Sequence, residues 1–185
     1  MKYLQFLFAF MVLASSFGCS ETRKYQDDRN WTERVAGDIK LQAPVDIYHS
    51  PDMERQAGKG DSSTAVIYTS APDEVFRVVV SRVDFETETK LDIDRIIASG
   101  DQAMSAAIGD SSPVVTYDPC EWPGVVCRRG SFTGEYKGRP FRVLSLFLLR
   151  DRTMWNVVVA YSDEADKEYA ERVLTSVVLE PNKES

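Results

Sequence analysis

RPFRVLSLFLLRDRTMWNVVVAY, residues 139–161, is the run that decides the fold. It contains two segments, residues 141–150 and 154–161, that are rich in β-branched and aromatic side chains, as packed β-strands are. The polar residues Asp151, Arg152 and Thr153 separate the two segments. We therefore predict two antiparallel strands joined by a tight turn.

The first of these strands is apolar on both faces. Because side chains alternate along a strand, its large apolar residues divide into two sets. One face carries Phe141, Val143, Phe147 and Leu149, and the other carries Leu144, Leu146 and Leu148. Such a strand needs cover on both sides of its sheet.

The neighbouring segments extend this hairpin in both directions. Residues 125–135 read as a preceding strand, joined to it by a turn at residues 136–139 that contains Gly138. Downstream, Ser162 or Asp163 can cap a helix whose apolar stripe runs from Ala165 to Leu174. Residues 177–179 then form a short closing strand.

The upstream half predicts three strands and another helix. Residues 38–44, 64–70 and 75–84 are strand-like, residues 49–63 read as a mobile loop, and residues 114–117 return to extended structure. Between them, residues 91–108 show helical periodicity, with Thr89 or Asp92 as the cap and Gly109 at the end. The chain is therefore predicted to be an α+β domain, an antiparallel sheet covered by two amphipathic helices.

The N-terminus has the features of a secretory signal. Lys2 precedes a short apolar run at residues 4–13, and small residues lead to Cys19. Cys19 after Gly18 matches the lipidated cysteine of bacterial lipoproteins, although Ser16 stands where an aliphatic residue is usual. Ser16 and Gly18 also fit the ordinary signal peptidase, which would leave a secreted soluble protein.

We divide the chain into a signal peptide (1–18), a lipid-anchored polar tether (19–34), the folded domain (35–180) and a polar tail (181–185). Loss of the signal leaves 21 basic residues against 29 acidic ones, a net charge of −8. This balance argues against a nucleic-acid-binding surface, which needs a basic stripe.

Two cysteines remain if Cys19 carries lipid. Cys120 and Cys127 are predicted to form a disulfide in an oxidising compartment, and closing so short a loop stabilises by about 2.5 kcal/mol. The alternative is two buried, unpaired cysteines. Trp122, inside the loop, is either a rigid contact for a partner or a cover for one end of the sheet.

No catalytic, metal or cofactor signature stands out. His49 is the only histidine, so a His-based metal cluster is excluded. Gly58 to Thr64 fails the phosphate-loop pattern. Asp84, Glu86 and Glu88 would share a strand face and could bind Ca²⁺ or act as an acid/base pair, or simply be solvated.

The order of elements resembles the PsbP-like α/β/α sandwich. The resemblance rests on the opening strand ending in Pro44, the paired strands, the helix, the meander, and a terminal helix running into Ser176-Val177-Val178-Leu179. That family includes a photosystem II extrinsic subunit, a Ran-binding import factor and small bacterial lipoproteins of the DcrB type. The resemblance implies a fold for residues 35–180, with no functional residue to carry over.

The sequence therefore predicts a non-catalytic lipoprotein of the cell envelope. Cys19 would anchor it in a membrane facing the periplasm or exterior, and its domain would bind or help assemble a protein partner. A carboxylate-dependent hydrolase and a purely structural envelope component are the alternatives.

Overall fold

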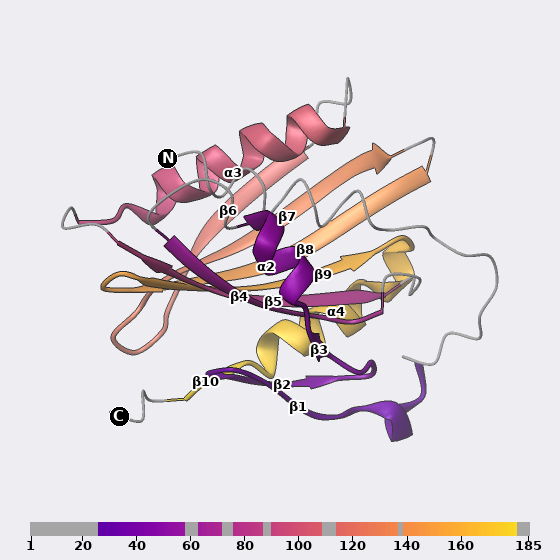
Figure 1. Ribbon diagram of the computed structural model, residues 1–185. Coiled ribbons are helices and arrows are strands. Elements are labelled where there is room, and N and C mark those ends of the chain that lie inside the picture. The colour runs from indigo at the N-terminus through magenta and orange to yellow at the C-terminus, as the bar shows by residue number, and fades with distance from the viewer. Residues whose placement is uncertain are drawn as a thin grey trace.

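The larger of two antiparallel sheets runs through the middle of the molecule, with strand order β3-β4-β5-β9-β8-β7-β6 (Figure 1). Its strands are β3 (Tyr48–His49), β4 (Ser63–Thr69), β5 (Arg77–Phe85), β9 (Thr153–Tyr161), β8 (Arg139–Arg150), β7 (Val126–Tyr136) and β6 (Val114–Cys120). The computed structural model describes residues 26–57, 63–71, 76–86, 90–108, 114–136 and 139–180.

The predicted meander is confirmed. Strands β7, β8 and β9 are consecutive antiparallel neighbours, and Arg150 pairs with Thr153 across a two-residue turn. In this turn Asp151 has φ 52°, a left-handed conformation that Asp tolerates better than most residues. Positive φ at this position lets the tight turn match the twist of the two strands.

The two faces of β8 belong to two separate cores, as its alternation predicted. Leu144, Leu146 and Leu148 lie in the first core with Phe76, Val78, Trp155 and Val157 of neighbouring segments. Phe141, Val143, Phe147 and Leu149 lie in the second core with Val79, Met154 and Val158. The sheet is therefore buried on both sides through its centre.

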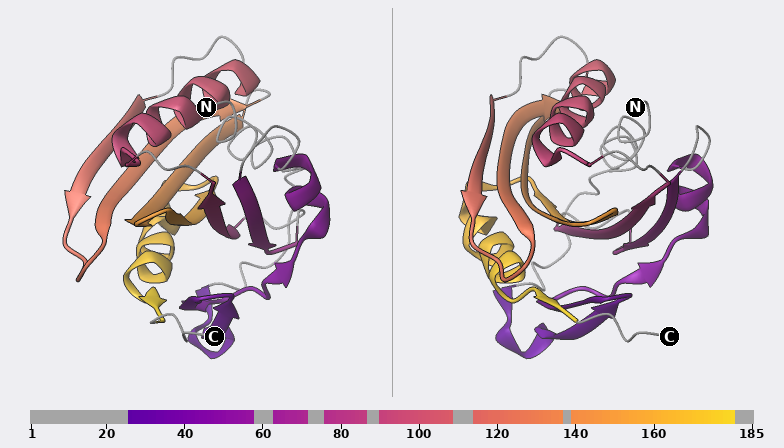
Figure 2. Two further views of the ribbon diagram at one scale, coloured as in Figure 1. Left: turned by 60° about the vertical axis from the view of Figure 1, so that its left-hand side comes forward. Right: turned by 90° about the vertical axis from the view of Figure 1, so that its left-hand side faces the viewer.

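Different elements cover the two faces. The first core is closed by α4 (Lys167–Thr175) and by a three-stranded sheet of β1 (Thr32–Ala36), β2 (Ile39–Ala43) and β10 (Val178–Leu179). The second core receives Met53 and Ala57 from α2 (Pro51–Ala57) and three isoleucines from α3 (Ile93–Ile108). Figure 2 shows the large sheet strongly curved, with α3 inside the curve and the small sheet outside it.

This arrangement confirms an antiparallel α+β domain but corrects its details. The cover is not two helices alone, because the predicted first and closing strands form a second sheet, in which Val178 pairs with Lys40. Part of the predicted loop at 49–63 is helix α2. Its seven residues carry only Met53 and Ala57 as buried apolar side chains, too few for a visible helical period.

The folded structure also includes residues expected in the tether. A short 3-10 helix, η2 (Asp28–Asn30), leads into β1, and Trp31 is buried in the first core. The Arg172 guanidinium of α4 lies 4.1 Å from the centre of the Trp31 ring and donates to Asp28 at 2.5 Å. These contacts attach the start of the domain to α4. A second short 3-10 helix, η3 (Glu164–Asp166), directly precedes α4 in the chain.

Helix α3 is held to the sheet by a tyrosine packed over a glycine. Asp92 caps the helix by accepting the backbone N–H of Asp94 at 3.0 Å, while Thr89 and Gly109 lie outside the described residues. The Tyr117 hydroxyl of β6 donates to Asp101 at 2.5 Å. A Cβ on Gly130 would lie 2.5 Å from the Tyr117 ring, so the close packing requires glycine there.

Asp101 generates a pH-dependent prediction. Burial raises the pKa of the Asp101 carboxyl, and the hydrogen bond from Tyr117 opposes part of this rise. Because its folded-state pKa exceeds the unfolded one, this group makes the protein less stable as pH rises through that window. We expect Asp101→Asn, which can keep the hydrogen bond without ionising, to raise the free energy of unfolding at pH 7.

The advantage of Asp101→Asn should shrink as pH falls below the unfolded-state pKa of aspartate, since both proteins are then neutral at this position. Urea unfolding at pH 7 and pH 3 measures this difference, with the exposed Asp118→Asn as the control. An advantage that is independent of pH would contradict the explanation.

Candidate functional site

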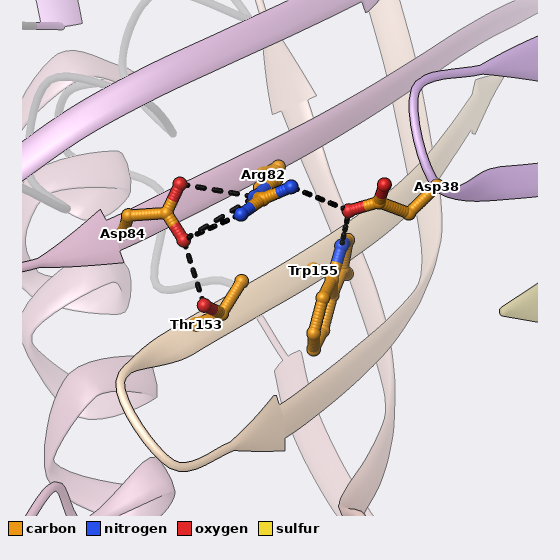
Figure 3. Close-up of polar contacts among 5 residues, drawn as sticks. All are labelled: Asp38, Arg82, Asp84, Thr153 and Trp155. Atoms are coloured by element: carbon orange, nitrogen blue, oxygen red, sulfur yellow. Dashed lines mark hydrogen bonds and ion pairs between the residues drawn. The ribbon is translucent and has the colours of Figure 1, made fainter. Parts of the chain in front are cut away.

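The turn between β1 and β2 is tied to the large sheet by one carboxylate. Gly37 has φ +61° and lets the chain turn, which places Asp38 over β5 and β9. Asp38 Oδ2 accepts a hydrogen bond from Arg82 Nη1 at 2.7 Å and another from Trp155 Nε1 at 3.1 Å (Figure 3). A single oxygen therefore joins the two sheets.

The other side of the Arg82 guanidinium is engaged by Asp84. Arg82 Nε lies 3.2 and 3.0 Å from the two oxygens of Asp84, and the Thr153 hydroxyl donates to Asp84 Oδ1 at 2.7 Å. Burial lowers the pKa of Arg82, but the hydrogen bonds and charges of Asp84 and Asp38 outweigh it and raise the pKa overall. We call Asp38, Arg82, Asp84, Thr153 and Trp155 the junction cluster.

A pocket of about 180 Å³ lies beside the junction cluster, between the two sheets. Its walls come from β4, β5, β9 and the β1–β2 turn, and most of them are apolar. The lining residues are Ala36, Gly37, Asp38, Val66, Tyr68, Val80, Arg82 and Trp155. The cluster residues Asp38 and Arg82 thus provide the charged part of an otherwise apolar pocket.

The polar groups of the junction cluster are already engaged with one another. Each carboxylate already accepts hydrogen bonds from Arg82 and from one neutral donor. Among the described residues, no three His, Cys, Asp or Glu side chains converge as metal ligands. The pocket can therefore hold an apolar group next to a fixed set of charges.

The predicted disulfide forms. Cys120 and Cys127 are bonded, with Cα atoms 5.1 Å apart, and they face each other at the end of the β6–β7 ladder. Cys127 is buried in the first core. The bond therefore closes the loop that carries Trp122 and fixes the loop to the sheet.

Trp122 is half-buried and packs against the first core. This contact favours the interpretation in which the Trp122 indole covers one end of the sheet. Its remaining exposed part leaves it available as a contact beside the disulfide.

The other candidate side chains are separated in the fold. His49 Nε2 lies 2.7 Å from Glu54 Oε1 on α2. Strand β5 ends at Phe85, so Glu86 follows the strand, while Glu88 lies outside the described residues. The only short basic pair of the predicted meander, Arg128 and Arg129, is split between the two faces of β7, where the side chains pair with Asp94 of α3 and Glu171 of α4.

Two further expectations concern residues outside the described ranges, namely Cys19 and most of the loop from Gly58 to Thr64. In the part of the chain that the structure describes, no helix is both long enough and apolar enough to cross a membrane.

Of the junction cluster, sequence reasoning named only Asp84, as one of three carboxylates on a strand face, and missed the other four residues. The strongest signal of the cluster is Arg82, a charged residue within the otherwise apolar and hydroxyl run from Val78 to Val83. The turn residue Asp38 lies 44 positions away from it, and no local pattern joins the two.

The junction cluster generates a stability prediction. We expect Asp38→Asn and Arg82→Met each to lower the free energy of unfolding by about 1–2 kcal/mol, the size of partly exposed charge-assisted hydrogen bonds. Because the two side chains contact each other, the double variant should lose about 0.5–1 kcal/mol less than the sum. Urea unfolding of the four proteins measures this coupling.

A matched control is Arg55→Met, which removes an exposed ion pair with Asp52 on α2. This variant should stay within about 0.5 kcal/mol of the parent protein. If the losses in unfolding free energy from Asp38→Asn and Arg82→Met were strictly additive, the hydrogen bond between these side chains would not stabilise the contact between the two sheets.

Comparisons with known proteins concern the fold. No protein-family model matches the chain, and no curated sequence matches it. The cyanobacterial PsbP (CyanoP) of Synechocystis matches with a TM-score of 0.58 at 10% identity, over 89% of this chain and 98% of that one. LpqN of Mycobacterium tuberculosis, described as involved in cell envelope biogenesis, gives a TM-score of 0.43 at 12% identity, over 89% and 100%.

The similarity to cyanobacterial PsbP shows that the fold is PsbP-like, as the order of elements indicated. At 10% identity it shows the fold alone.

Proposed function

We propose that this protein is a lipid-anchored, non-catalytic component of the cell envelope whose PsbP-like domain binds a protein partner. The anchor would be Cys19, and the domain would face the periplasm or exterior. The signal-like N-terminus and the acidic composition support this proposal. A secreted soluble form without lipid is the alternative location.

The observation that carries the proposal is the pocket between the two sheets. Its volume of about 180 Å³ is below the roughly 300–1,000 Å³ typical of small-molecule sites, and it suits a single side chain of a partner. Anchoring side chains of protein interfaces commonly fill such rigid, partly apolar pockets. Because Trp155 and Arg82 are fixed by hydrogen bonds, the pocket needs little ordering when a partner binds.

The loop closed by Cys120 and Cys127 supplies a second candidate contact. Trp122 is held there at limited conformational freedom, which favours binding through its exposed part. We assign it a supporting role, because its contact with the first core already accounts for much of its surface.

The competing hydrolase is less well supported. It would use carboxylates from the set Asp84, Glu86 and Glu88, but Asp84 is engaged by Arg82 and Thr153. A purely structural envelope component would need neither the pocket nor a partner, so partner capture separates it from the proposal.

The anchor is tested by Cys19→Ser. We expect the parent protein to fractionate with membranes and Cys19→Ser to appear in the soluble envelope fraction, because lipid can no longer be attached. Metabolic labelling with a fatty acid, followed by fractionation, measures both properties. Membrane retention of an unlabelled Cys19→Ser protein would refute the lipid anchor.

The partner site is tested by filling the pocket. Val66→Phe places a ring in the pocket, and Thr64→Phe adds the same ring to an exposed position on the same face of β4. The amount of partner protein captured is measured after cross-linking in intact cells. We expect the parent and Thr64→Phe to capture the same partner in similar amounts. Val66→Phe should capture at least about tenfold less, which corresponds to a loss of about 1.4 kcal/mol or more in binding free energy.

Unfolding curves must first show that both phenylalanine variants remain folded. Equal capture by all three proteins would remove the pocket from the interface. A folded protein that captures no defined partner at all would favour the structural alternative.

A further inference from the structure

We propose that the pocket between the sheets receives a lysine side chain of the protein partner. This inference rests on the proposed function and names the chemistry of the group that enters. It follows from the shape of the pocket, from the net charge of the junction cluster, and from two oxygen atoms that take part in no hydrogen bond among the described residues.

The walls suit an unbranched alkyl stem. Val66, Val80 and Ala36 offer aliphatic surface, and the rings of Tyr68 and Trp155 complete the lining. A lysine stem of four carbons can bury its methylene groups along such walls while its ammonium group stays near polar atoms. The aromatic rings also attract a cation through their π faces.

The charges at the pocket favour a cation. The junction cluster contains two carboxylates, Asp38 and Asp84, against the single guanidinium of Arg82. The whole chain carries a net charge of −7. Asp38 and Arg82 line the pocket with opposite charges, and Asp84 pairs with Arg82 from outside the lining, so the cluster keeps one net negative charge that favours a cation over an anion.

Two acceptor atoms are available to the incoming group. Both hydrogen bonds to the Asp38 carboxylate go to Oδ2, and none among the described residues uses Oδ1. The hydroxyl of Tyr68 likewise makes no hydrogen bond among them. It lies beside the Asp38 turn, since a Cβ on Gly37 would be 3.8 Å from it. The three N–H donors of an ammonium group could use both atoms.

Lysine fits these acceptors better than arginine. Arginine binds carboxylates best through a planar pair of N–H groups, and Arg82 already engages Asp84 in this way, with Nε donating to Oδ2 and Nη2 donating to Oδ1. A compact ammonium needs only one oxygen from Asp38. The pocket therefore matches a point charge on a flexible stem.

The test uses n-butylammonium, which reproduces the lysine side chain, and pentanoate, which has the same alkyl chain with the opposite charge. The full lipid-anchored protein is titrated in detergent micelles. The reporter is the NMR signal of the Trp155 indole N–H, because this group lines the pocket and donates to Asp38. We expect a saturating shift with n-butylammonium and none with pentanoate.

Variants connect the signal to the pocket. Asp38→Asn should weaken n-butylammonium binding about tenfold, and Val66→Phe should abolish it. Asp46→Asn removes a carboxylate that is exposed and pairs with Arg34 outside the pocket, so it should leave binding unchanged. If Asp38→Asn does not fold, Tyr68→Leu tests the same site by removing the ring and its hydroxyl.

The outcomes separate this inference from the proposed function. Equal shifts with n-butylammonium and pentanoate, or full binding by a folded Asp38→Asn protein, would overturn the cation assignment. If Val66→Phe still abolished partner capture, the proposed function would stand. Binding of n-butylammonium that fails to compete with the captured partner would assign the site to a free amine and overturn the assignment to a partner lysine.

Discussion

Strand β8 must be covered on both faces, and the rest of the structure depends on this constraint. Leucines on one side and phenylalanines on the other make both surfaces of the central sheet apolar. Water would contact either surface unless another layer were packed on it. The chain meets this need with α2 and α3 on one face, and with α4 and the three-stranded sheet on the other.

Covering the first face with a small sheet creates the candidate site. A helix alone would present only side chains to the large sheet, whereas the β1–β2 hairpin also brings a tight turn close to β5 and β9. Asp38 in that turn meets Arg82 and Trp155, and the turn closes one side of the pocket. The pocket is thus a consequence of how two sheets meet, and the junction cluster keeps its shape constant.

The sequence predicted the elements whose signals are local. The meander from β7 to β9, helix α3 and helix α4 followed from periodicity, caps and turn residues, and the alternation of β8 assigned its side chains to the correct cores. Helix α2 was missed because two buried side chains leave little pattern in seven residues. Strand β1 was missed because Val35 and Glu33 face outward, so its stability comes from pairing with β2.

By itself, the sequence determined the fold class and the two-sided core, because each depends on residue type at short spacing; it made Cys120–Cys127 the preferred pair, and the structure shows the bond. Only the tertiary structure decided the candidate site. Asp38, Arg82 and Trp155 belong to three strand segments or turns far apart in the chain, and charged or aromatic residues at such distances carry no common period. Their meeting depends on the register of two sheets and on the packing between them, which the complete fold specifies.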